Sequence, residues 1–359
     1  GDEFVVCLED FGEAGNAAAA AQKLLLVLSE KYEIGNSEVY ATPSIGIAMY
    51  PDSGDTAERL VKAADVAMYE AKKTGGGRFQ YYSASLNTKL AQREELEVGL
   101  RHALVRNEFV LHYQPRIDLT SGRLIGLEAL LRWQHPRFGL LPPARFLPIL
   151  ESSGLIHSAG EWVIETACRQ LAGWQRKFEL PDLSVAINIS PQQLMHKRLA
   201  DVMKKTLADT MLDPGCVELE IGEGDIVRKR SAELETLRNL RKLGVRLSLD
   251  QFGTRDVSFE SLDNGFIDSF VLDRDLVADI MENDSHQRIV RAAIAMAQGL
   301  DIEVAAEGVE TVSQLEFLKS CNCNLAQGFL ISRPMQPEKV AAVLRSEIAG
   351  TSLLARGMP

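Results

Sequence analysis

The 359-residue chain carries 39 Lys and Arg against 50 Asp and Glu, a formal net charge of −11. This balance argues against a nucleic-acid duplex as partner, because a duplex requires many phosphate contacts, whereas a small phosphate ligand held by a few residues and a metal stays possible. At about 150 residues per domain, the length predicts two domains, one of them large enough to be a barrel.

The five cysteines, at 7, 168, 216, 321 and 323, form no pattern of paired ligands or disulfides. We therefore expect free thiols in a reducing, cytoplasmic compartment. Cys321 and Cys323 do not predict a zinc site, because no His or second Cys pair lies near them in the sequence. No window approaches the about 18 apolar residues of a membrane span, so we expect no membrane segment.

The first 85 residues alternate short apolar runs with helical patterns. We expect strands over 4–8, 39–49 and 79–82, and helices over 17–28 and 55–71. Asp2 and Glu3 precede the first strand at a turn, which indicates that the chain begins inside a hairpin. Asp55 and Glu58 resemble a capping box at the start of the second helix, and three glycines at 75–77 end it.

Three segments of this part resemble the second half of a GGDEF diguanylate cyclase domain: 1–4 (GDEF), 44–47 (SIGI) and 64–72 (ADVAMYEAK). The resemblance implies that Asp2 and Glu3 correspond to the acidic residues that serve the metal and the attacking hydroxyl. It also implies that the guanine-binding residues would lie upstream of the first residue, and Gly76 replaces a phosphate-binding Arg. We therefore expect a partial domain over 1–85 that is a folded support and not a cyclase.

A charged segment over 86–107 carries Leu90, Leu96, Leu100 and Leu104 at helical spacing, which predicts a linking helix. A second domain is expected over 108–347, followed by a C-terminal tail over 348–359. Within it, helices such as 159–177 and 287–300 alternate with strands. The strand candidates are 109–114, 124–131, 185–189, 217–221, 245–250, 266–272, 302–306 and 327–331. This alternation predicts an α/β fold with a TIM-like (β/α)8 barrel.

Chemistry in such barrels lies at the C-terminal ends of the strands, and five expected strand ends carry oxygen ligands. They are Glu128, Asn188, Glu220, Asp250 and Glu307. Taken alone, Glu128 with Arg132 would be an ordinary ion pair inside the barrel. Four carboxylates that converge on one rim repel each other unless cations lie between them, and hard oxygen ligands favour Mg²⁺ or Mn²⁺.

The second part resembles an EAL cyclic-di-GMP phosphodiesterase domain throughout its length. The segments that carry the resemblance are 128–132 (EALLR), 188–194 (NISPQQL), 220–223 (EIGE), 250–254 (DQFGT), 306–311 (AEGVET) and 327–328 (QG). Several motifs in a fixed order are far more specific than one short pattern.

The resemblance implies a role for each matching residue. Glu128, Asn188, Glu220 and Asp250 would hold the first metal, Arg132 would contact a ligand phosphate, and Gln114 would face a guanine. Glu307 and Gln327 would complete the shell of ligand and catalytic water. Glu223, Asp273 and Glu310 would support these residues from behind.

The sequence departs from the family at the positions that serve hydrolysis. The family's two cations flank a water at a separation of about 3.5–4 Å and are bridged by the second of two consecutive aspartates. Here that position is Gln251, a neutral amide, so we expect one metal site and no second one. Val271 stands where the family has a water-positioning lysine. Gly222 and Arg255 replace the usual Thr and Gly.

Three functions follow from this pattern. We favour a catalytically degenerate receptor that binds cyclic-di-GMP and signals to an unidentified protein partner, with a homodimer as one permitted assembly. The first alternative is an active or weakly active metal-dependent phosphodiesterase that produces pGpG. The second is a scaffold that binds no nucleotide. Nucleotide binding separates the scaffold from the other two, and pGpG formation separates the receptor from the phosphodiesterase.

Overall fold

The computed structural model describes residues 2–9, 14–35, 37–73, 75–196, 198–222, 231–253, 266–350 and 353. The chain forms two compact units, Gly1–Val98 and Gly99–Pro359, and the boundary falls within helix α3 (Ala84–Ala103). The predicted linking helix is therefore present. Within the described ranges, no helix has the length and apolar character needed to span a bilayer.

The first unit consists of helices and two small sheets. Its helices are α1 (Ala14–Leu28) and α2 (Ala57–Lys73). Strands β1 (Lys31–Ile34) and β2 (Ser37–Tyr40) pair antiparallel, and β3 (Ser44–Ile47) pairs parallel with β4 (Arg78–Tyr81). Helix α2 lies directly on β3, since a Cβ at Gly46 would meet the carbonyl oxygen of Ala64 at 1.8 Å.

Three expectations for this unit were wrong in detail. Residues 2–9 are exposed and form no strand, because a strand needs a hydrogen-bonded neighbour and no described residue pairs with them. The strand expected over 39–49 is divided between β2 and β3 at 41–43, where Pro43 lacks an N–H. The capping box expected at Asp55 and Glu58 was also wrong, because Thr56 accepts the backbone N–H of Arg59, at 3.3 Å. Asp55 instead forms an ion pair with the Arg59 guanidinium at 2.7 Å.

The second unit is a closed eight-stranded barrel, as predicted. Its strands are β5 (Phe109–Asp118), β6 (Leu124–His135), β8 (Ser184–Ile189), β9 (Val217–Gly222), β10 (Arg246–Phe252), β11 (Ser269–Leu272), β12 (Glu303–Ala306) and β13 (Leu325–Ala326). They follow the order β5-β13-β12-β11-β10-β9-β8-β6, and a β5–β6 pairing closes the ring. Strand β5 is antiparallel to both neighbours and the other strands are parallel, while β7 (Gly139–Leu141) extends β6 as a hairpin.

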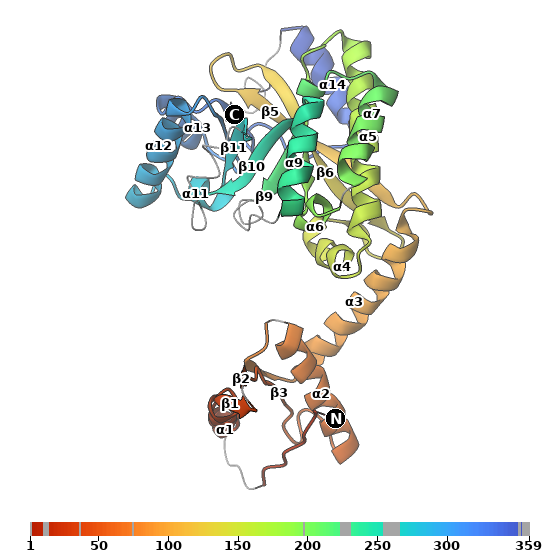
Figure 1. Cartoon of the computed structure of the whole chain (residues 1–359), viewed down its shortest axis with the longest axis vertical. Helices are drawn as coiled ribbons and strands as arrows, with labels where there is room; N and C mark the ends of the chain where they lie inside the picture. Colours follow the sequence, from red (N-terminus) through yellow and green to blue (C-terminus); the bar gives the residue numbers. More distant parts are fainter. Residues whose placement is uncertain are drawn as a thin grey trace. The chain divides into compact units, whose positions relative to one another are not determined.

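Helices cover the outside of this barrel (Figure 1). They are α4 (Leu147–Ser152), α5 (Ile156–Phe178), α6 (Pro191–Leu194), α7 (Arg198–Thr210), α9 (Ser231–Leu243), α11 (Arg274–Ala278), α12 (Asp284–Gly299), α13 (Val312–Ser320) and α14 (Pro337–Ile348), with 3-10 turns at Pro143–Arg145 and Pro214–Cys216. The main hydrophobic core lies between them and the strands: Leu219 and Ile221 of β9 belong to it, together with Leu171 of α5. The alternate residues of β9, Glu218 and Glu220, therefore face the barrel interior.

The last predicted strand was misplaced. The chain pairs at Leu325–Ala326 and then turns, so that the N–H of Ser332 donates to the carbonyl oxygen of Gly328 at 2.9 Å. At Gly328 the backbone packs directly on Val309, since a Cβ there would lie 2.1 Å from the Val309 carbonyl oxygen. The run over 327–331 thus forms a turn and not a paired strand, with Gln327 and Ile331 buried and Phe329 exposed.

Candidate strand-end site

The predicted ligand residues lie on neighbouring strands of the closed barrel. Asn188 of β8 is directly in register with Glu220 of β9, and Gln114 of β5 is in register with Glu128 of β6. Asp250 lies at the end of β10, the strand after β9, and Glu307 follows β12. Parallel strands bring their C-terminal ends to one rim, which is why side chains so distant in sequence meet here. We refer to Glu128, Glu220, Asp250 and Glu307 as the acidic ring.

Glu128 is buried, with 5% of its surface exposed, and its carboxylate is held by two amides. The Asn188 Nδ2 donates to its Oε1 at 2.7 Å, and the Gln327 Nε2 donates to its Oε2. The Gln327 Nε2 also donates to the Gln114 Oε1 at 3.0 Å, and the Gln114 Nε2 donates to the Ser332 carbonyl at 2.8 Å. The expected ligand residues Gln114, Asn188 and Gln327 therefore form one hydrogen-bond network around Glu128.

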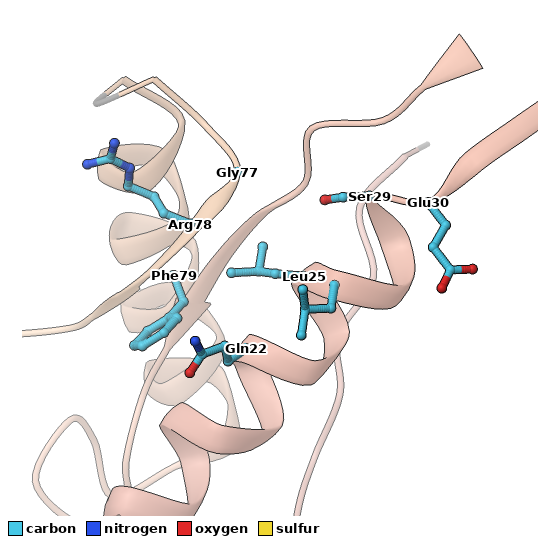
Figure 2. Close-up of a pocket in the computed structure, with 8 residues that line it drawn as sticks. Gln22, Leu25, Ser29, Glu30, Gly77, Arg78 and Phe79 are labelled. Carbon is cyan, nitrogen blue, oxygen red and sulfur yellow. The ribbon is translucent and has the colours of Figure 1, made fainter. Parts of the chain in front are cut away.

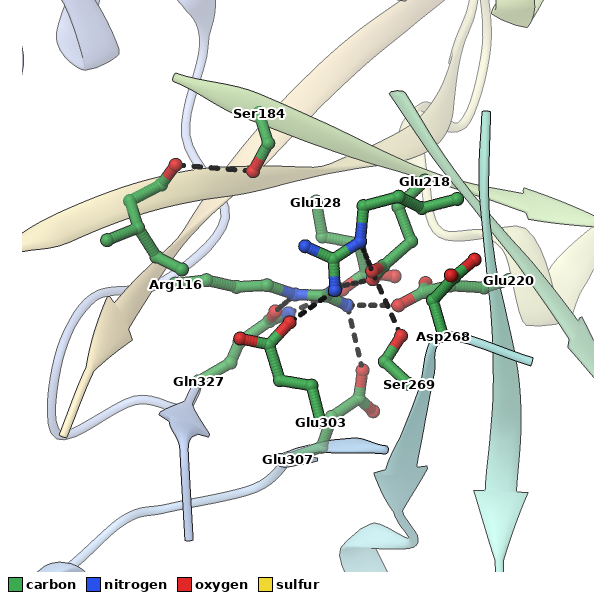
Figure 3. Close-up of polar contacts among 12 residues, drawn as sticks. Arg116, Glu128, Ser184, Glu218, Glu220, Asp268, Ser269, Glu303, Glu307 and Gln327 are labelled. Atoms are coloured by element: carbon green, nitrogen blue, oxygen red, sulfur yellow. Dashed lines mark hydrogen bonds and ion pairs between the residues drawn. The ribbon is translucent and has the colours of Figure 1, made fainter. Parts of the chain in front are cut away.

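Sequence reasoning missed the cation at the centre of this network, Arg116 of β5 (Figure 3). Its side chain is 4% exposed and forms ion pairs with Glu220 and, at 3.0 Å, with Glu218, while Glu307 lies 3.8 Å away. Burial opposes its charge, but Glu220, Glu128, Glu218 and Glu307 raise the pKa of Arg116 above its ordinary value. One signal was present in the sequence: a buried strand that contains an Arg needs carboxylate partners elsewhere.

The acidic ring holds more negative charge than this one guanidinium balances. Burial and the Glu128 carboxylate raise the pKa of Asp250 to about 6. Burial and neighbouring carboxylates also raise the pKa of Glu220 and of Glu307, although Arg116 opposes both shifts. Such shifts mark a cluster whose ionised form is unfavourable until a further cation enters.

The chemistry of the ring fits a hard divalent cation. Carboxylate and amide oxygens on four successive strands, from Glu128, Asn188, Glu220 and Asp250, are the donors that Mg²⁺ and Mn²⁺ prefer. Within the described ranges, no three acidic, His or Cys side chains converge as a ready metal cage. The reason is visible in the contacts, since the carboxylates are turned onto Arg116, Asn188 and Gln327. A cation would bind among the carboxylate oxygens that these contacts hold in place.

Arg132 lies on the same face of β6 as Glu128, further towards the rim. Its guanidinium is half-buried and donates to the Leu131 carbonyl oxygen at 2.8 Å. Burial lowers the pKa of Arg132, and the Glu128 carboxylate opposes this shift, so the two charges are close enough to interact. The side chain thus has donors left for an anion at the mouth of the barrel.

The two positions that depart from the family pattern differ in their surroundings. Val271 of β11 is completely buried inside the barrel, where it packs against Ala305, Leu325 and Ile125. Gln251 is exposed at the end of β10 with a φ of 59°, and its N–H donates to the Asp250 Oδ1 at 2.7 Å. The barrel therefore has an apolar wall at one position and an amide in a left-handed conformation at the other.

The residues expected to support the site lie at its margin. Asp273 caps helix α11 by accepting the N–H of Asp275 at 2.7 Å, and its charge contributes to the raised pKa of Asp250. Glu310 forms an ion pair with Arg274 at 3.0 Å. Glu223 lies outside the described residues, as does Arg255.

The first unit contains a groove of its own, of about 750 Å³, between α1 and β4 (Figure 2). Leu25, Leu26 and Phe79 supply its apolar wall, and Arg78 and Glu30 lie at its edges. Asp2 and Glu3, the acidic pair of the expected hairpin turn, do not line it and are exposed. The structure therefore brings no carboxylate pair together at this groove as it does at the acidic ring.

Two family models match the chain. The model described as EAL domain matches residues 97–334, and the model described as diguanylate cyclase, GGDEF domain, matches residues 1–78. The first match contains every residue of the acidic ring together with Arg116, Asn188 and Gln327. The second contains the first unit up to the start of β4.

Curated relatives match nearly the whole of this chain. The chain is 40% identical over 342 residues to the bifunctional diguanylate cyclase/cyclic di-GMP phosphodiesterase MucR of Pseudomonas aeruginosa, a match that covers 95% of this chain and 50% of that protein. It is 36% identical over 335 residues to the cyclic di-GMP phosphodiesterase PdeR of Escherichia coli, with coverage of 93% and 50%. The chain thus spans about half the length of these relatives.

A solved structure with the same fold contains a nucleotide. The PaMucR phosphodiesterase in complex with c-di-GMP superimposes with a TM-score of 0.66 and 39% sequence identity, covering 68% of this chain and 99% of that one. The structural likeness therefore extends over nearly the whole of that solved chain.

Proposed function

Because the chain belongs to the EAL domain family and carries a GGDEF segment before its EAL domain, we propose that its barrel is a receptor that binds cyclic-di-GMP without hydrolysing it. The observation that carries the proposal is the strand-end network itself. Glu128, Asn188, Glu220 and Asp250 supply a cation site, and Arg132 offers a guanidinium at its mouth. A metal and a guanidinium side by side are suited to a phosphodiester.

The ligand would be held by charge and by the amides. One divalent cation in the acidic ring would supply a positive charge for a phosphate oxygen, and Arg132 would donate to the same phosphate or its neighbour. Gln114 can meet a base edge, because its amide is both donor and acceptor. The similarity to the c-di-GMP complex of PaMucR supports this choice of nucleotide.

Hydrolysis needs more than the residues that bind. In a two-metal mechanism, both cations act on one water, so a bridging carboxylate is required between them. Gln251 is a neutral amide, and Val271 lies in an apolar wall whose described members, Ala305, Leu325 and Ile125, carry no ammonium group. Loss of one electrostatic or acid–base group often lowers the rate by about a hundredfold, so the loss of two leaves little turnover.

A second candidate is a weak metal-dependent phosphodiesterase that releases pGpG. It is favoured by the acidic ring, whose carboxylates include Glu307 beside the metal ligands. The names of the relatives MucR and PdeR also favour it. One metal-bound water near Glu307 would then act without a bridge at Gln251.

We infer that the first unit supports the barrel and is not a cyclase. Asp2 and Glu3 are exposed in a segment that pairs with no described strand, so no described residue holds their two carboxylates at a metal. Gly76 also supplies no guanidinium at the position where the family has a phosphate-binding Arg.

Two assays on the same preparation test the proposal. Calorimetry with cyclic-di-GMP in Mg²⁺ is expected to show one binding event, and chromatography after incubation with Mn²⁺ is expected to show no pGpG. The absence of any binding would overturn the receptor and leave the scaffold. Sustained pGpG formation would identify a phosphodiesterase instead.

A further inference from the structure

We infer that Arg116 is a positioning residue of the strand-end site, a fixed internal cation that holds Glu220 and Gln327 in their orientations before any metal or ligand binds. This inference rests on the proposed function only for the identity of the ligand. The role itself concerns the metal-free barrel. Arg116 does not face the ligand as Arg132 does, because its guanidinium is buried among side chains of β9 and Gln327, the residue after β13.

The contacts use all three nitrogens of the guanidinium. Its Nε donates to the Gln327 Oε1 at 2.7 Å, its Nη1 to the Glu218 Oε1 at 3.0 Å, and its Nη2 to Glu220. Gln327 has only one amide oxygen, and once that oxygen accepts from Arg116 the amide nitrogen must point to Glu128 and Gln114. Arg116 therefore fixes which end of the Gln327 amide meets the acidic ring.

Glu218 holds this guanidinium one level before Glu220 along β9. Its Oε1 accepts from Arg116, and its Oε2 accepts from the Ser269 hydroxyl at 3.0 Å and lies 3.5 Å from the Arg246 Nε. Glu218 is two residues before Glu220 on β9, so both carboxylates face the interior at successive levels. Glu218 thus holds the Arg116 guanidinium in place, and the guanidinium holds the Glu220 carboxylate.

The interior of this barrel also explains why a charge is found here. Eight-stranded α/β barrels usually fill their interior with branched apolar side chains. Among the described residues, one small cluster of apolar side chains, Val271, Ala305, Leu325 and Ile125, lies separate from the main core. The remainder of the interior beside Arg116 is polar, so order in it depends on hydrogen-bond geometry.

A lysine cannot replace this function. The guanidinium is a planar fork whose nitrogens point in fixed directions, so one side chain reaches partners on two strands at once. An ammonium group is a compact point charge that keeps the positive charge but does not fix the orientation of the Gln327 amide. The variant Arg116→Lys therefore separates positioning from simple charge compensation.

The test is performed first on the metal-free full chain in chelator. Glutamine-selective ¹⁵N labelling, with Gln327→Glu to assign the signal, reports hydrogen exchange of the Gln327 side-chain amide. In Arg116→Lys we expect this exchange to accelerate by about tenfold or more, because the amide loses the contact that fixes its direction. Arg241→Lys, which alters an ion pair with Asp268 away from the ring, is the matched control and should leave the exchange rate unchanged.

The second readout is Mn²⁺ affinity by calorimetry, which we expect Arg116→Lys to weaken by about tenfold. An unchanged amide exchange rate in a folded Arg116→Lys chain would overturn the inference. If that variant does not fold, Glu218→Gln decides, since it loosens the anchor while Arg116 remains: faster exchange supports the inference, and parental exchange overturns it. A parent chain that binds neither Mn²⁺ nor nucleotide would contradict the proposed function, and the amide exchange would still decide the role of Arg116.

Discussion

The amide of Asn188 donates to the carboxylate of Glu128 at 2.7 Å, although 60 residues separate them in the sequence. The two side chains come from adjacent parallel strands, β8 and β6. The contact gives the acidic ring a neutral neighbour, Asn188, which donates to a carboxylate without adding charge. The amide oxygen of Asn188 would also offer a metal a ligand that does not repel the neighbouring carboxylates.

Asn188→Asp should therefore lower the stability of the metal-free chain and make it more dependent on a cation. The change replaces a donor to a buried carboxylate by a like charge, and a hydrogen bond to a charged group contributes about 1.5–3 kcal/mol. We expect a lower unfolding midpoint in chelator and a larger rise on addition of Mg²⁺ than in the parent. Asn322→Asp, at an exposed turn, is the control, and equal shifts in both variants would contradict the role given to Asn188.

Arg132→Ala should weaken cyclic-di-GMP binding by about tenfold or more, because a charge-assisted hydrogen bond to phosphate is worth about 1.5–3 kcal/mol. The side chain is half-buried at the mouth of the barrel, so its removal should alter affinity more than fold. Calorimetry measures the affinity, and circular dichroism checks the fold. Arg169→Ala, on the exposed face of α5, should bind as the parent does. Parental affinity in Arg132→Ala would place the phosphate elsewhere.

Gln251→Asp combined with Val271→Lys should restore Mn²⁺-dependent pGpG formation, and each single change should restore less, because the two groups act on one water. The aspartate suits its position, since Asp adopts a positive φ more readily than Gln. The lysine enters an apolar wall, so Val271→Met is the control for its bulk. A time course of pGpG for the parent and these variants is the measurement. Inactivity of the folded double variant would show that further positions, such as Arg255, also limit turnover.

Gly328→Ala should destabilise the barrel, whereas Gly173→Ala should not. A Cβ at Gly328 would meet backbone atoms of Val309, and overpacking of this kind costs about 1–3 kcal/mol or more. A Cβ at Gly173, within helix α5, meets nothing within 4 Å, so the gain in helix propensity should stabilise by about 0.5–1 kcal/mol. Chemical denaturation of the two variants measures the difference. Equal stability would mean that the turn after β13 adapts.

The sequence predicted the barrel and the gathering of polar side chains at one rim, because both follow from patterns that neighbouring residues reveal. Apolar runs that alternate with helical segments indicate strands and helices, and the parallel barrel then places Glu128, Asn188, Glu220 and Asp250 at one rim. The same patterns failed where pairing decides the structure. An apolar run is a strand only if another strand lies beside it. Residues 4–8 have no such neighbour among the described residues, and residues 327–331 form a turn.

Only the tertiary structure revealed the role of Arg116. Its place in a buried strand indicates that Arg116 needs polar partners but not which ones, because Glu218, Glu220 and Gln327 lie more than a hundred residues further along the chain. They meet it because β5 closes the barrel beside β13 and directs alternate side chains inward, level with those of β9. Local periodicity determines which residues face inward, whereas closure of the barrel determines which of them meet. Closure of the barrel therefore stabilises the buried charge of Arg116, because it brings the partners of the guanidinium together.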